Sequence, residues 1–177
     1  MILFYSGINM SKRLTTIDIS KEDLKFSCAH FTIFSETDRE RLHGHNFKVR
    51  ATVTAPVYEN GLCFDYQEIK SRLRSICKTL DEYVLLPGES PYLKIEKVSD
   101  QYEVFFNGEK LFFAVSDTQV LAIRNTTVEE LSFLVLEKMI KQDNFFIDSD
   151  VEEITVGVSS GDGQWGSYSW KATDAKK

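Results

Sequence analysis

The sequence has few cysteines and no long apolar run, and each shortage excludes a class of protein. Its three cysteines, Cys28, Cys63 and Cys77, are odd in number and form no Cys-x-x-Cys pair. A disulfide framework is therefore not expected, and a reducing cytoplasm is the simplest location. No stretch approaches the ~18 consecutive apolar residues of a membrane-spanning helix. Residues 1–6 are apolar but lack a basic flank, so we do not expect a signal peptide.

Positive charge is also scarce, with 21 Lys and Arg against 27 Asp and Glu and a formal net charge of −6. Because there is no basic stripe, a nucleic-acid partner is not expected. What remains is the composition of a soluble globular protein, with 42% hydrophobic and 27% charged residues. A chain of 177 residues can bury a real core, and we predict a single domain over residues 1–177.

Local patterns predict two early strands and two helices. Phe26–Ile33 is aromatic and β-branched, and Asn46–Val57 alternates apolar and polar residues. One helix is expected after Asp65 and the other after Thr127, because each of these capping residues is followed three positions later by a glutamate. The first helix has one clear apolar face, formed by Ile69, Leu73, Ile76 and Leu80.

The region between the helices predicts a β-hairpin. Tyr102–Phe106 and Glu109–Phe113 flank Asn107-Gly108, a strong two-residue turn signal, within a segment at about residues 88–124. Two closing strands are expected at Glu153–Ser159 and Gly166–Trp170. The order of elements predicts an antiparallel α+β domain with two helices on one face of the sheet.

All three histidines of the chain lie within a short segment. On a strand, His43 and His45 face the same side, and Gly44 leaves the space between them open. His30 lies on the preceding strand, which antiparallel pairing would bring alongside. Three neutral imidazoles with an open fourth position form the arrangement of a catalytic zinc site. The alternatives are ordinary structural histidines, or a site for Cu, Fe or Ni.

Motifs around these histidines resemble one protein family. Phe26-Ser-Cys-Ala-His30, Leu42-His-Gly-His-Asn-Phe47 and Gly61-Leu-Cys-Phe-Asp65 are similar to motifs of the 6-pyruvoyltetrahydropterin synthases and the related 6-carboxytetrahydropterin synthases. Asn125–Glu129 resembles the family's Pro-Thr-x-Glu helix start, and Val156–Val158 its closing strands. The resemblance spans roughly residues 24 to 170.

The resemblance implies a tunnelling fold, an antiparallel four-stranded sheet with two helices on one face and an inserted β-hairpin. Such chains assemble as trimers that pair into hexamers, with active sites between subunits. The implied substrate is a small pterin, chiefly 7,8-dihydroneopterin triphosphate, whose side chain is eliminated or cleaved. Zn²⁺ would be held by His30, His43 and His45, and the substrate-binding positions would be Thr127, Glu129 and Ser160.

The chain departs from the family at its catalytic positions. Arg39 stands where the usual catalytic cysteine would be, but Glu40 fits a branch with Glu-x-x-His-Gly-His. Glu40 is our candidate general base, on the expectation that partial burial raises its pKa. Asp81 is retained, whereas Glu82 replaces the family's histidine and could share a proton with Asp81. The alternatives are that Glu40 is a solvated loop residue and that Asp81 and Glu82 only follow a helix end.

Ser160 is a further departure, because the family has there a glutamate that holds the pterin through paired hydrogen bonds. Asp162 or Glu129 could compensate for this loss. Three hypotheses follow. The chain is a zinc-dependent pterin lyase, a zinc-binding relative that has lost catalysis and serves in ligand binding or assembly, or an enzyme acting on a non-pterin substrate.

Overall fold

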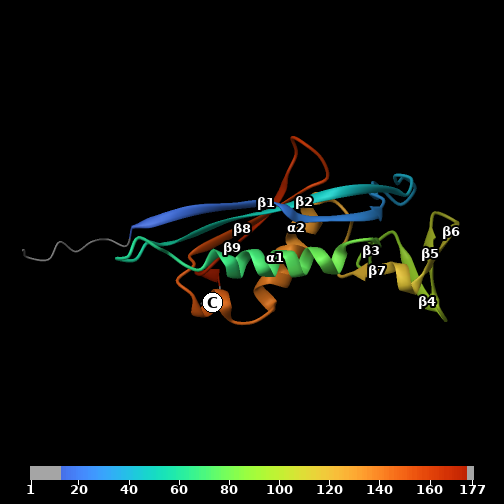
Figure 1. The fold of residues 1–177 in the computed structure, drawn as a ribbon. Coiled ribbons are helices and arrows are strands. Elements are labelled where there is room, and N and C mark those ends of the chain that lie inside the picture. Colours follow the sequence, from blue (N-terminus) through green and yellow to red (C-terminus); the bar gives the residue numbers. More distant parts are fainter. Residues whose placement is uncertain (1–12, 175–177) are drawn as a thin grey trace, which may run out of the picture.

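The computed structural model describes residues 13–174. The opening residues 1–6, for which no signal peptide is expected, lie outside the described part. The molecule is elongated, with one long sheet, helices packed beneath it and a small second sheet at one end (Figure 1). Over residues 13–174, no helix has both the length and the apolar character needed to cross a membrane.

The main sheet has six strands in the order β7-β3-β1-β2-β8-β9. Four of them are antiparallel neighbours: β1 (Leu14–His30), β2 (His43–Pro56), β8 (Glu153–Ser159) and β9 (Gly166–Lys171). Two short strands, β3 (Tyr83–Pro87) and β7 (Thr118–Leu121), extend the sheet in parallel beside β1. The predicted antiparallel four-stranded sheet is thus confirmed, and β3 and β7 widen it on the side of β1.

Strand β1 differs from its predicted bounds at both ends. It begins at Leu14 rather than Phe26, because residues 14–20 pair with the end of β2, and a bulge separates Ser20 from Lys25. It ends at His30, after which residues 31–33 turn away from the sheet. The early part was missed because half of its side chains are polar and lie on the exposed face of the sheet.

Both predicted helices are present: α1 spans Tyr66–Leu80 and α2 spans Val128–Lys141. The Asp65 carboxylate accepts the Gln67 N–H at 2.9 Å, and the Thr127 hydroxyl accepts the Glu130 N–H at 3.5 Å. The predicted apolar face of α1 is buried. Both helices pack on the same face of the main sheet, as predicted, and the short helix α3 (Phe145–Asp148) follows α2 (Figure 1).

The insertion forms a three-stranded sheet of β4 (Lys94–Val98), β5 (Gln101–Phe106) and β6 (Glu109–Ala114). The predicted hairpin is its β5–β6 pair, whose turn has Asn107 at φ 44° and Gly108 at φ 78°. The turn η1 (Val115–Asp117) leads from β6 to β7. The inserted sheet packs through its own apolar cluster, formed by Phe31, Ile33, Leu86, Val104 and Phe106.

Candidate metal centre

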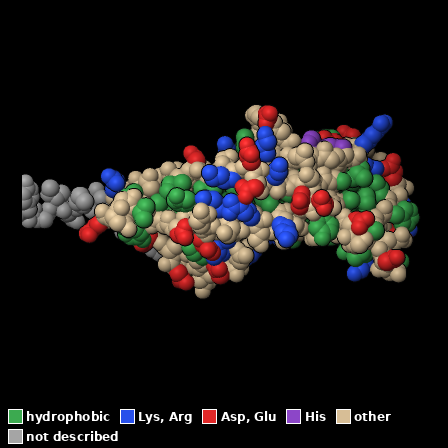
Figure 2. All heavy atoms as spheres, in the orientation of Figure 1, with side chains coloured by type: hydrophobic (Ala, Val, Ile, Leu, Met, Phe, Trp, Pro, Cys, Tyr) green, Lys and Arg blue, Asp and Glu red, His purple; other side chains and the backbone are tan. Residues whose placement is uncertain are grey.

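Antiparallel pairing of β1 with β2 brings the three histidines together. His30 lies directly opposite His43, and Cys28 lies opposite His45. Because side chains alternate along a strand, all three rings share the face that carries the buried residue Phe47. His30 is buried, whereas the other two rings are half-buried and reach the surface near the end that carries the insertion (Figure 2). The pairing inferred from the sequence is therefore confirmed.

The ring nitrogens converge on one point. One ligand nitrogen from each ring can be chosen so that all three lie within 4.8 Å of one another, and the Nε2 atoms of His43 and His45 are 3.1 Å apart. The Nδ1 atom of His43 lies 2.8 Å from the Arg41 carbonyl oxygen. Since a carbonyl only accepts, Nδ1 carries the proton, and Nε2 presents its lone pair toward His45.

His30 is held in its neutral form. The pKa of His30 is lowered to about 4, mainly by burial and also by the rings of His43 and His45, while Glu40 and the Thr126 carbonyl oppose the shift. Neither ring nitrogen of His30 has a partner in hydrogen-bond geometry among the described residues. A buried polar nitrogen left without a partner is costly unless something binds it.

The cluster fits a tetrahedral metal ion. At metal–nitrogen distances of about 2.0–2.1 Å, two tetrahedral imidazole ligands of Zn²⁺ lie about 3.3 Å apart. The His43–His45 separation is already close to that value, and the unpartnered nitrogens of His30 complete a three-nitrogen donor set. Edge contacts of Phe47 with the rings of His30 and His45 supply an apolar side to the site.

Glu40 is the acidic side chain beside the histidines. Its Oε2 lies 3.9 Å from His43 Nε2 and accepts the Thr32 N–H at 2.9 Å. Partial burial raises the pKa of Glu40, but the hydrogen bonding from Thr32 and the imidazoles of His43 and His30 outweigh it. The net shift is downward, so the expectation of a raised pKa is wrong, and Glu40 is a carboxylate at neutral pH.

A cavity of about 320 Å³ adjoins the histidines and Glu40. The three positions that the resemblance assigns to substrate binding, Thr127, Glu129 and Ser160, all line it. Gln164 also lines it and was missed, although it follows the turn-forming Gly161-Asp162-Gly163 segment, which could have drawn attention to it. The lining residues include no Lys or Arg, so the acids Glu40 and Glu129 set its charge.

The wall formed by α2 depends on one close approach. A Cβ atom on Gly166 would lie 2.5 Å from the carbonyl carbon of Val128, closer than real atoms approach. Glycine at this position therefore lets the first turn of α2 sit directly against β9. That contact fixes Glu129 at the cavity.

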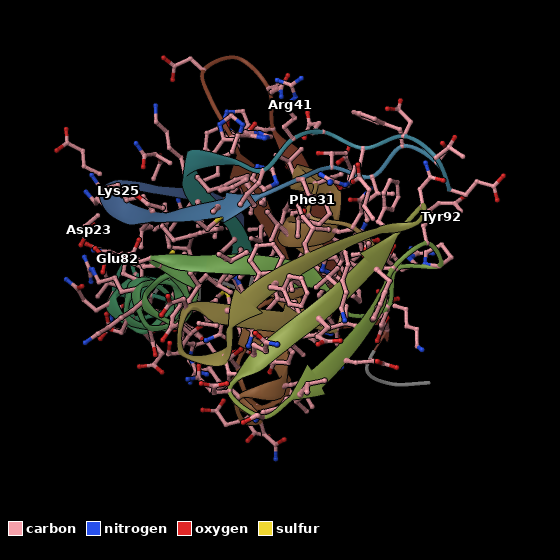
Figure 3. The ribbon with its side chains drawn as sticks, turned by 90° about the vertical axis from the view of Figure 1, so that its right-hand side faces the viewer. Asp23, Lys25, Phe31, Arg41, Glu82 and Tyr92 are labelled. Carbon is pink, nitrogen blue, oxygen red and sulfur yellow. The ribbon has the colours of Figure 1, made fainter. Side chains whose placement is uncertain are left out.

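The two other predicted catalytic residues lie elsewhere. Asp81 accepts the Ser27 N–H at 2.7 Å, and Glu82 lines a separate cavity of about 450 Å³. That cavity is lined by Ser27, Gly44 and Asn46, which alternation places on the opposite face of β1 and β2 from the histidines, and also by Cys28 and His45 from the histidine face. Figure 3 shows Glu82 beside the end of α1, far from Arg41 on the segment that leads into β2. Within one chain, Asp81 and Glu82 do not meet Glu40.

Comparisons with known proteins agree with this fold. A family profile described as 6-pyruvoyl tetrahydropterin synthase matches residues 18–170. A protein of Methanocaldococcus jannaschii, provisionally named a 6-carboxy-5,6,7,8-tetrahydropterin synthase, is 24% identical over 146 residues, covering 82% of this chain and 89% of the relative.

Solved structures show the same relationship. The 6-pyruvoyl tetrahydropterin synthase of Plasmodium vivax superposes with a TM-score of 0.84 at 26% identity, covering 90% of this chain and 99% of that one. A variant of that enzyme with the same TM-score carries alanine in place of a glutamate described as a catalytic residue. The profile match covers most of the sequence, and the chain therefore belongs to the 6-pyruvoyl tetrahydropterin synthase family of pterin-synthase-like lyases.

Proposed function

We propose that the chain is a zinc-dependent lyase acting on the side chain of 7,8-dihydroneopterin triphosphate or a related pterin. The observation that carries the proposal is the convergence of His30, His43 and His45 beside Glu40 at one cavity. When bound by these imidazoles, Zn²⁺ would supply a Lewis acid that polarises hydroxyl groups of the substrate side chain.

Glu40 is proposed as the general base. Its lowered pKa keeps it ionised at neutral pH, and it lines the same cavity as the histidines. It would take a proton from the substrate side chain and return it to the product as carbon–carbon or carbon–oxygen cleavage proceeds. A glutamate is also described as a catalytic residue in the similar Plasmodium vivax enzyme, which supports a glutamate as the base.

The substrate ring is proposed to bind at the wall opposite the histidines. Glu129, in the first turn of α2, can accept two N–H groups from an amino-pyrimidine edge through charge-assisted hydrogen bonds. Thr127 and Ser160 can each add one neutral hydrogen bond. The Gln164 amide can donate and accept at once, which suits the lactam edge of a pterin.

Asp81 and Glu82 are proposed to act in the site of a neighbouring copy within a homo-oligomer, a trimer or a hexamer. The support is their separation from Glu40 within one chain, together with the family resemblance. Ser160 favours a second candidate function, a zinc-binding relative without turnover or with a non-pterin ligand, because one neutral hydrogen bond replaces a paired carboxylate contact.

Product analysis by mass spectrometry tests the proposal. Zinc-loaded protein is incubated with 7,8-dihydroneopterin triphosphate beside a His45→Ala control. Release of a 6-hydroxymethyl, 6-pyruvoyl or 6-carboxy pterin, absent from the control, is the expected result and identifies the bond that is cleaved. Unchanged substrate at full zinc occupancy would overturn the lyase proposal and favour the second candidate.

A further inference from the structure

Glu40 lies near the end of an excursion of residues 31–42 that joins β1 to β2. This segment folds back on itself, because the Glu40 N–H donates to the Thr32 carbonyl at 2.8 Å and Ile33 pairs with Arg39. The Glu40 carboxylate accepts the Thr32 N–H in return. Residues 31–42 lie outside the main sheet. The position of Glu40 beside His43 therefore depends on the contacts that hold this segment in place.

One side of the segment is anchored to the approach to α2. The Asn125 side chain accepts the Ile33 N–H at 3.1 Å and donates to the Ile33 carbonyl at 2.8 Å. The Thr126 hydroxyl donates to the Phe31 carbonyl at 2.8 Å. These bonds hold residues 31–33 directly, whereas the returning residues that carry Glu40 are reached from this side only through their pairing with Thr32 and Ile33.

Arg39 holds the returning strand from the other side. Its Nη1 donates to the Glu40 carbonyl at 2.9 Å, and its Nη2 contacts the Glu109 carboxylate of β6 at 2.8 Å. The guanidinium carbon lies 5.1 Å from the ring centroid of Phe31 and 5.5 Å from that of Phe106 in β5. The Arg39 side chain is 15% exposed, so its contacts with the two rings are largely shielded from water, whereas the Glu109 carboxylate is 63% exposed.

We propose that Arg39 is a positioning residue that uses the inserted sheet β4–β6 to fix Glu40 against the histidines. A planar guanidinium can stack on rings and donate along two directions at once, which a lysine cannot do. Figure 3 shows Phe31 where the segment leaving β1 meets the inserted sheet. Arg39, which stands where the family has its usual cysteine, thus positions the base Glu40. The inserted sheet supports the site through its contacts with Arg39.

This inference deepens the proposed function and rests on it, so its test needs a readout besides turnover. The variants are Arg39→Met, Arg39→Lys and Glu109→Gln. Glu96→Gln is the matched control, because it breaks the exposed pair with Lys94 on the same inserted sheet without touching residues 31–42. Each variant is loaded with zinc and analysed for metal content, for kcat and KM separately, and for amide hydrogen exchange by peptide.

In Arg39→Met we expect faster exchange confined to residues 31–42 and a kcat lowered about 10- to 100-fold, since small misplacements of a catalytic group cost that much. KM and zinc content stay as in the unmodified protein. Glu109→Gln shows the same pattern more weakly, and Arg39→Lys does not restore kcat. The double variant is no worse than Arg39→Met alone, because both changes break one linkage. Glu96→Gln changes nothing.

Three results would overturn the inference: unchanged exchange in residues 31–42, faster exchange throughout the chain, or loss of zinc together with kcat. If the unmodified protein turns over no pterin, the proposed function fails, and the exchange readout still decides whether Arg39 links this segment to the inserted sheet. If Arg39→Met does not fold, Glu109→Gln carries the same test.

Discussion

The two cavities beside β1 and β2 share the same pair of strands but differ in content. The cavity at the histidines, about 320 Å³, brings together three imidazoles, an ionised carboxylate and a helix start. The cavity at Glu82 is larger, about 450 Å³, but of the three histidines only His45 lines it, and the buried unpartnered nitrogens of His30 do not. The histidine cavity differs in holding buried ring nitrogens that lack a partner and can bind a metal. Cavity size alone therefore does not identify the reactive site.

Removing a metal ligand should give the largest difference between the two faces. In His45→Ala we expect zinc content to fall from one ion per chain toward none. Turnover should fall about 100-fold or more, which exceeds the cost of losing a residue that only hydrogen-bonds to a metal ligand. Asn46→Ala changes the next residue, which faces the other cavity, and should keep its zinc. Metal analysis after dialysis measures both. Equal zinc in the two variants would contradict the assignment of the ligands.

Neutralising Glu40 should separate chemistry from metal binding. Glu40→Gln keeps the shape and can still accept the Thr32 N–H, but it removes the base, so we expect turnover to fall about 10²–10⁴-fold with zinc retained. Glu36→Gln, at an exposed position in the same segment, is the control. Single-turnover kinetics at full zinc occupancy measures the effect. Turnover within a few-fold of normal in Glu40→Gln would show that another group takes the proton.

Restoring a carboxylate at position 160 should sharpen recognition in the histidine cavity. We expect Ser160→Glu to tighten binding of a dihydropterin about tenfold, since hydrogen bonds to a charged group contribute about 1.5–3 kcal/mol. Ser167→Glu places the same charge at an exposed position on β9 and should change nothing. Titration calorimetry with 7,8-dihydroneopterin measures both. Equal affinity in the two variants would argue for a ligand that is not a pterin.

Glu82→Gly is the change from which we expect the smallest effect, a small gain in stability. It tests whether the second cavity takes part in turnover. Glu82 has φ 65°, a left-handed conformation that costs about 1 kcal/mol for a residue with a side chain. We expect Glu82→Gly to raise the melting temperature by about 2–4 °C. Turnover should fall even so, because Glu82 is proposed to serve a neighbouring copy.

Ser99→Gly is the matched control for that change. Ser99 has φ 56° in the turn between β4 and β5, so glycine should stabilise it in the same way. Its distance from both cavities means that turnover should be unchanged. Thermal unfolding and product formation are measured for both variants. Full turnover in Glu82→Gly would contradict a role for Glu82 in a neighbouring copy. Glu82 would then serve only in the turn after α1.

Much of the fold and the metal centre could be predicted because the signals are local. The caps at Asp65 and Thr127, the alternation along β2 and the Asn107-Gly108 turn each act over a few residues, and each prediction is confirmed. The histidines were found because all three lie within 16 residues of sequence, on segments whose pairing the pattern implied.

The short parallel strands β3 and β7 could not be predicted, because their pairing joins segments about 35 residues apart and leaves no period in the sequence. The third inserted strand, β4, was missed since its residues are mostly polar or half-exposed. The expected direction of the Glu40 pKa shift was wrong for a related reason. Its sign depends on a hydrogen bond from Thr32 and on imidazoles that only the folded segment brings near.

The sequence by itself determined which residues can bind a metal, where the helices begin and that the early strands pair, because capping, alternation and donor chemistry are properties of neighbouring residues. Only the tertiary structure decided which groups share a space. It brought Glu40, Glu129 and Gln164 to the histidines, left Glu82 in a separate cavity, and bound Arg39 to an insertion 70 residues further along the chain. These contacts depend on how separate segments pack, because packing brings together residues that are distant in sequence.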